Sequence, residues 1–116
     1  MDAMVEQLAY KDGRYDPKAF MFVLRALRSA TPERKHVSGA VLSHAVLSMA
    51  KHVFGVAAWL VLNEWGLRTT RDIGEIIYLL AENDVVRTSP DDSIEDFDNV
   101  FDLRKELEET YPWSDG

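Results

Sequence analysis

Six carboxylates in one short stretch are the side chains of this chain best suited to chemistry. They lie within residues 91–102 and comprise Asp91, Asp92, Glu95, Asp96, Asp98 and Asp102. Carboxylate oxygens ligate Ca²⁺ and Mg²⁺, and paired carboxylates can act as general acid and base. The stretch lacks the alternating spacing and central glycine of an EF-hand loop. Three interpretations follow: a solvated loop, a surface that recognises a basic partner, or a metal site, which fits the spacing least.

The three histidines, His36, His44 and His52, are the other candidate metal ligands. On one helix, the eight positions from His44 to His52 correspond to about 12 Å of rise. A ligand nitrogen lies about 2 Å from a bound zinc ion, so this pair cannot share one. A metal-dependent enzyme would need a histidine and several carboxylates to meet in one pocket. We predict no metal and no cofactor, and expect His36 to donate hydrogen bonds around a helix start.

No catalytic motif is visible in the rest of the chain. The sequence contains no Gly-rich phosphate loop, no HExxH and no GxSxG. It has no cysteine, which excludes disulfides, thiol nucleophiles and cysteine-based zinc sites and fits a reducing compartment. We therefore predict a non-enzymatic protein without catalytic residues.

The net charge of −7 is unevenly distributed along the 116 residues. Residues 1–88 hold eleven Lys and Arg against ten Asp and Glu, whereas residues 89–116 hold two against ten. Such asymmetry reports on partners and solubility more than on fold. It predicts that residues 89–116 contact a protein partner with a basic surface.

The chain is expected to form a single domain over residues 1–116. Its first residues lack the basic and apolar regions of a signal peptide. The most apolar window, residues 53–62, is shorter than the roughly 18–20 residues that a membrane span needs. We expect a cytoplasmic protein with no membrane contact.

Helix signals divide the first half of the chain. A short helix is expected within residues 1–13. Asp16 and Pro17 are good N-cap and first-turn residues for a second helix. Ser38 should cap a third helix that runs to about Val53. The expected buried face of this third helix consists of Leu42, Ala45, Val46, Met49 and Val53.

Residues 56–86 have the outline of a helix-turn-helix. The first helix, 56–65, is apolar on nearly all sides and is expected to be the central, most buried one. Gly66 fits the left-handed position that ends it, and Leu67 could then pack on Leu62. Thr69 should cap the second helix, whose predicted buried stripe is Ile73, Ile76, Ile77 and Leu80.

The segment after this unit allows two structures. Residues 85–88 are rich in β-formers, residues 89–92 form turns, and residues 97–103 alternate, which together predict a β-hairpin. Alternatively, Ser93 and Asp96 form a capping box at the start of a helix. We favour the hairpin. The predicted fold is then mainly α, with four to five helices, a helix-turn-helix and a short C-terminal β-hairpin; this is a winged-helix-like arrangement in which residues 89–116 form an acidic wing and tail.

The charges of the second helix oppose the DNA binding that a helix-turn-helix suggests. In such proteins this helix enters the major groove, and Lys and Arg neutralise phosphates. Here Arg71 is accompanied by four acids, so nucleic-acid binding through this helix is not expected. A basic cluster elsewhere, Arg25, Arg28, Arg34 and Lys35, either offsets the acidic tail or touches an acidic surface such as nucleic acid. A nucleic-acid-associated regulator that uses this cluster is the alternative function.

Trp113 is an aromatic residue in a polar stretch, beside Tyr111 and Pro112. Such a side chain either packs back onto its own domain or anchors an interface. We assign Trp113, together with the six acids, to partner binding and consider a homodimer. The predicted function is a non-enzymatic protein-interaction module of winged-helix type that contacts a basic partner through its acidic wing and tail.

Four strings of the sequence carry a family resemblance: GRYDPKAFMFVLRAL (13–27), HVSG (36–39), EWGLRTTRDIGEII (64–77) and EDFDNVFD (95–102). In these motifs the chain resembles an uncharacterised bacterial family of short acidic proteins. Leu103 departs from the aromatic residue expected at that position. The resemblance implies no activity and no catalytic residues.

Overall fold

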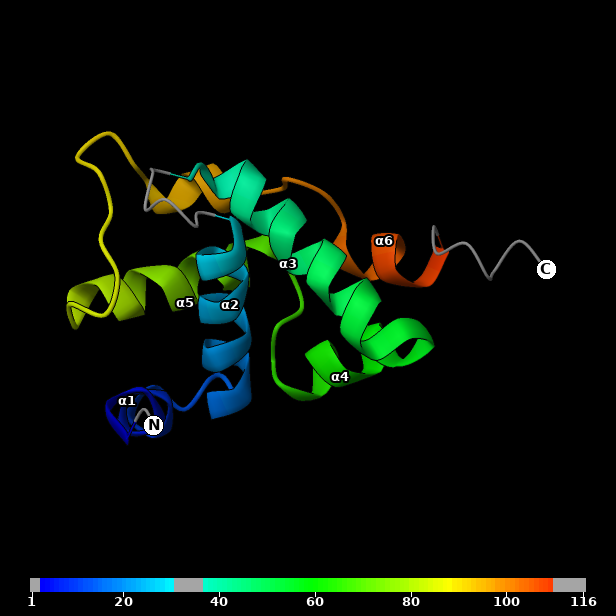
Figure 1. The fold of residues 1–116 in the computed structure, drawn as a ribbon, viewed down its shortest axis with the longest axis horizontal. Helices are drawn as coiled ribbons and strands as arrows, with labels where there is room; N and C mark the ends of the chain where they lie inside the picture. The colour runs from blue at the N-terminus through cyan, green and yellow to red at the C-terminus, as the bar shows by residue number, and fades with distance from the viewer. Residues whose placement is uncertain (1–2, 31–36, 110–116) are drawn as a thin grey trace.

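Helices make up every regular element of residues 3–30 and 37–109, the residues that the computed structural model describes (Figure 1). In chain order they are α1 (Ala3–Asp12), α2 (Pro17–Ala30), α3 (Gly39–Phe54), the 3-10 turn η1 (Gly55–Ala57), α4 (Ala58–Glu64), α5 (Thr70–Glu82), the 3-10 turn η2 (Ile94–Phe97) and α6 (Leu103–Glu109). The mainly α prediction agrees with this structure. The predicted β-hairpin is wrong, because no strand occurs in these two ranges.

The predicted starts of α2 and α3 are confirmed, and these two helices pack against each other. The Lys18 backbone N–H donates to Asp16 Oδ1 at 2.8 Å, so Asp16 caps α2. Ser38 caps α3 by accepting from the Val41 backbone N–H at 3.1 Å. Each cap satisfies a backbone donor that the first turn of a helix leaves unpaired.

The buried face of α3 differs from the prediction in its second half. Leu42 and Val46 are buried as expected, but Leu47 and Ala50 follow them, while Val53 is 46% exposed. Leu42, Val46 and Ala50 are four positions apart, whereas one helical turn has 3.6 residues. The row of buried residues therefore winds slowly around the helix. The last turn of α3 therefore presents Val53 to solvent.

The prediction that residues 56–65 form the central, most buried helix is wrong. α3 ends at Gly55, whose φ is +55°, and only Ala58 and Leu62 of α4 are buried. Val56 and Leu60 are 74% and 62% exposed. α4 is a short peripheral helix that packs on α3 and α6 and leaves Leu60 uncovered.

The stretch Gly39–Glu64 is the one described helical stretch long and apolar enough to cross a membrane. Length and composition alone are weak evidence for a span, since the core helix of a soluble protein passes the same test. η1 divides this stretch in two at Gly55.

The predicted turn after α4 is confirmed in detail. The Leu67 N–H donates to the Leu62 carbonyl at 2.9 Å and the Gly66 N–H to the Asn63 carbonyl at 3.0 Å, which together form a Schellman ending. Gly66 has φ +88°, and a Cβ there would lie 2.7 Å from the Arg14 carbonyl oxygen. Gly66 is therefore required both by its conformation and by the segment packed on it.

Asp72 joins this turn to the start of α2. Its Oδ2 accepts from the Arg68 and Thr69 backbone N–H groups, both at 2.9 Å. The second bond completes a capping box with Thr69, whose role as the cap was predicted. Its Oδ1 accepts from the buried Tyr15 hydroxyl at 2.6 Å. The Asp16 N–H also donates to the Trp65 carbonyl at 3.0 Å. Residues 15–16 are thus fastened to the turn between α4 and α5.

α4 and α5 do not form a winged helix. α5 packs mainly on η2 and α2, whereas α4 packs on α3 and α6 (Figure 1). In place of a hairpin, the alternative capping box is present, with the Ser93 N–H donating to Asp96 Oδ2 at 3.1 Å. It begins η2, which lays Phe97 on α5, and the Thr70 hydroxyl donates to the Phe97 carbonyl at 2.6 Å.

Gly74 allows η2 to approach α5 closely. A Cβ at this position would lie 2.7 Å from the ring of Phe97 and 2.9 Å from its Cβ. The two residues therefore form one packed joint between α5 and η2.

We expect Tyr15→Phe to lower the free energy of unfolding by about 1–2 kcal/mol, because it removes a buried hydrogen bond to a carboxylate. Urea denaturation measures this effect. Tyr10→Phe is the matched control, since Tyr10 is 74% exposed and should change stability little. Equal effects of the two substitutions would contradict the role given to the Tyr15 hydroxyl.

The same bond predicts a pH dependence. Burial and the hydrogen bond to Asp72 raise the pKa of Tyr15 above its ordinary value of 10.0. Above about pH 10 Tyr15 loses its proton in the unfolded chain but keeps it in the folded chain. The contribution of Tyr15 to the free energy of unfolding is therefore fully present below that pH and decreases as the pH rises. The fall should be shallower in Tyr15→Phe.

We expect Gly74→Ala to destabilise the protein by about 1–3 kcal/mol, because the added methyl group overpacks the joint with Phe97. The sign of the change in the free energy of unfolding distinguishes the two cases, since Gly→Ala at an exposed position inside a helix stabilises by about 1 kcal/mol. In a double-mutant cycle, Gly74→Ala should cost less in a Phe97→Leu background. Stabilisation by Gly74→Ala alone would rule out the close contact.

Candidate functional site

The predicted acidic residues lie on and around η2 and at the start of α6. Five of them are exposed and Asp92 is half-buried. Three carboxylates accept backbone N–H groups: Asp92 from Ser89 at 2.6 Å, Asp96 from Ser93 at 3.1 Å, and Asp102 from Lys105 at 3.1 Å. These acids cap turns and a helix. This role was predicted only for Asp96.

Asp98 belongs to a chain of ion pairs across the surface of α5. Arg71 Nη1 lies 2.9 Å from Asp98 Oδ1, and Arg71 Nε lies 3.1 Å from Glu75 Oε2. Arg14 in turn contacts Glu75 Oε1 at 3.3 Å and Asp12 Oδ1 at 3.0 Å. The hydrogen bonds that Arg71 donates to Asp98 and, next in size, to Glu75 raise the pKa of Arg71. The single cation of α5 is therefore occupied by two carboxylates of its own chain.

The candidate metal ligands do not gather in the part of the chain that the structure describes. No group of three or more His, Asp or Glu side chains there could hold a metal ion. His44 stacks on Phe101, with ring centroids 4.9 Å apart, and His52 is exposed. His36 and Trp113 lie outside the described residues, as do Arg34 and Lys35 of the basic cluster.

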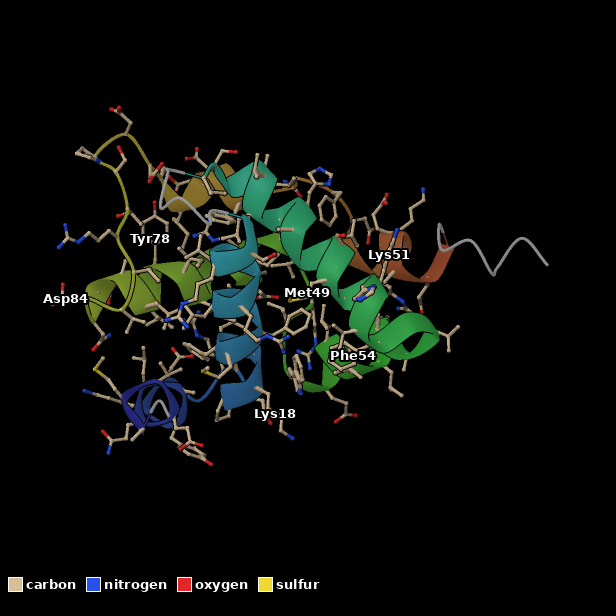
Figure 2. The ribbon with its side chains drawn as sticks, viewed as in Figure 1. Lys18, Met49, Lys51, Phe54, Tyr78 and Asp84 are labelled. Carbon is tan, nitrogen blue, oxygen red and sulfur yellow. The ribbon has the colours of Figure 1, made fainter. Side chains whose placement is uncertain are left out.

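A large hollow among the described residues was not predicted. This cavity of about 610 Å³ lies between α2, α3, α5 and the segment 85–97. Leu24, Leu42 and Ile77 contribute apolar walls, and the exposed Arg28 and Arg87 border it. In Figure 2, Tyr78 lies above α5, beside the segment that leads to η2. The sequence carried no signal for this cavity, because its walls come from four separate segments.

The Tyr78 hydroxyl is buried in this cavity without a hydrogen-bond partner among the described residues. Burial, with the charges of Asp92, Asp96 and Glu95 adding to it, raises the pKa of Tyr78. A buried hydroxyl without a partner costs free energy. The position contrasts with Tyr15, whose hydroxyl is fully engaged.

We expect Tyr78→Phe to leave the free energy of unfolding unchanged or to raise it by up to about 1 kcal/mol, because the removed group makes no described bond. Thermal and urea unfolding beside Tyr15→Phe provide the comparison. A loss similar to that of Tyr15→Phe would mean that the Tyr78 hydroxyl does have a protein partner.

Comparison with known proteins adds no relative. No family model matches the chain, no curated protein matches it, and no solved structure matches it. The resemblance to a bacterial family of short acidic proteins therefore stays a prediction, and any function must be argued from the structure itself.

Proposed function

We propose that this protein is a non-enzymatic protein-interaction module that binds a basic partner through an acidic surface. The acidic surface consists of Asp91, Asp92, Glu95, Asp96, Asp98 and Asp102. The observation that carries the proposal is that these side chains are mostly exposed while several are held in place by hydrogen bonds. Ordered carboxylates lose less conformational entropy on binding than free ones do.

The charge pattern supports a protein partner over nucleic acid. Carboxylates repel phosphates, whereas they attract Lys and Arg side chains and speed association with a basic surface. Arg71, which would have to contact phosphate in a helix-turn-helix complex, already pairs with Glu75 and Asp98. Arg25 and Arg28 are exposed on α2 but border two different hollows, so they do not form one continuous phosphate track.

Neutralising Asp91 and Glu95 tests the proposal with little risk to the fold, because neither carboxylate accepts a backbone N–H among the described residues. Glu95 accepts from the Ser93 hydroxyl, and a glutamine oxygen can accept the same bond. We expect Asp91→Asn/Glu95→Gln to weaken binding of a lysine-rich peptide about three- to tenfold, since exposed ion pairs contribute up to about 1 kcal/mol each. NMR titration at low ionic strength gives both the affinity and the residues contacted.

Glu82→Gln/Asp84→Asn is the matched control, because these two acids are also exposed but lie at the end of α5. The control should bind as tightly as the unaltered protein. Equal weakening by both pairs would indicate attraction to net charge alone and would refute a defined acidic surface. Salt-sensitive binding of duplex DNA that is lost in Arg25→Glu/Arg28→Glu would instead support the nucleic-acid alternative.

A further inference from the structure

A second hollow on the described surface is an aromatic groove between the start of α2 and the end of α3. It has a volume of about 370 Å³. Its floor is formed by Phe22, Phe54 and Trp65, whose ring centroids lie 5.5–5.6 Å from one another. Mutually packed rings of this kind are rigid and offer apolar area at low entropic cost. The aromatic groove is therefore already formed without an occupant.

Cations stand at the edge of the aromatic groove. Lys18 and Arg25 both border it, both are exposed, and neither forms an ion pair with a described residue. Figure 2 shows Lys18 and Phe54 on this side of the molecule. One acid, Glu6, also borders the groove. The rim is thus net positive in a chain whose net charge is −7.

An uncovered apolar side chain also borders the aromatic groove. Val53 lines it and is 46% exposed, and Val56 and Leu60, which follow in the sequence on η1 and α4, are 74% and 62% exposed. Exposed apolar surface beside a hollow is typical of a site of association. A segment that binds the aromatic groove should therefore carry apolar side chains for the groove and negative charges for its cationic rim.

The chain itself contains a segment with this chemistry. Residues 109–116 read ETYPWSDG, with the aromatic anchors Tyr111 and Trp113 and the acids Glu109 and Asp115. Trp and Tyr are the side chains most enriched at the centres of interfaces. Pro112 fixes its own φ, which reduces the entropy lost when such a segment binds. Aromatic-lined grooves are a common receptor for extended, proline-containing segments.

The position of α6 favours a second copy as the source of this segment. Figure 1 shows α6 on the side of the molecule away from α1 and from the first turn of α2, which together form one wall of the aromatic groove. We propose that residues 109–116 of one copy dock into the aromatic groove of another, with Trp113 on the aromatic floor and the acids beside Lys18 and Arg25. This self-association does not depend on the acidic surface proposed above.

The test uses a fluorescent peptide of residues 109–116 and full-length protein carrying Trp113→Ala as the receptor. We expect micromolar binding by fluorescence anisotropy. Lys18→Glu/Arg25→Glu in the receptor should weaken binding at least tenfold. Arg28→Glu/Arg87→Glu is the matched control, because these exposed arginines border the other cavity, and it should bind like the unaltered receptor.

A charge swap checks that the contact is direct. A peptide with Glu109→Lys/Asp115→Lys should bind the Lys18→Glu/Arg25→Glu receptor better than the unaltered peptide does. Sedimentation should show that the unaltered protein dimerises with rising concentration and that Trp113→Ala shifts it toward the monomer. Circular dichroism of each variant shows that the fold is retained.

Several results would overturn the proposal. One is a peptide that fails to bind, and another is a peptide that binds the charge-reversed receptor equally well. A concentration-independent monomer in which Trp113 is shielded would place the segment on its own chain instead. Loss of lipid-vesicle binding on Val56→Asp/Leu60→Asp, without any self-association, would assign the apolar surface to a membrane.

Discussion

The hydrogen bonds accepted by the Asp72 carboxylate are the interactions on which the rest of the structure depends. It accepts hydrogen bonds from the backbone of Arg68 and Thr69 and from the hydroxyl of Tyr15. One side chain therefore starts α5, fixes the turn that follows α4, and fastens the segment before α2. α2 also packs on α1, α3 and α5. The Asp72 carboxylate therefore helps to set the arrangement of the four longest helices, α1, α2, α3 and α5.

Three glycines mark where segments distant in the sequence come into contact. Gly66 admits the carbonyl of Arg14, Gly74 admits the ring of Phe97, and Gly39 lies where a Cβ would be 2.9 Å from the carbonyl oxygen of Asp96. The sequence strings that carry the family resemblance contain these residues and their partners. The contacts of the three glycines therefore have a structural explanation. The proposed functional surfaces use other, exposed side chains of the same strings as well as residues outside the strings.

Helix caps and turns could be predicted from neighbouring residues in the sequence. Features that depend on contacts between distant segments could not. The caps at Ser38 and Thr69 and the ending at Gly66 follow from residues a few positions apart, so the sequence suffices to place them. For the segment after α5 the sequence pattern favoured a hairpin over a capping box at Ser93, whereas the structure has the capping box and packs Phe97 on Gly74. The exposure of α4 was likewise hidden, because apolar composition does not reveal which element covers it. Among the candidate site residues, exposure of the acids was foreseeable, but the capping bonds of Asp92 and Asp102 were not.

The separation of Tyr15 and Asp72 along the chain also bears on how the protein folds. The two residues joined by that hydrogen bond are 57 positions apart in the sequence. Closing a loop of this length costs about 3–4 kcal/mol of chain entropy before its contacts repay it. The contacts of α1 with α2 and of α2 with α3 join neighbours and can form without that cost. We therefore expect residues 15–16 to join the turn before α5 late in folding, after the helices of the first half have packed on one another.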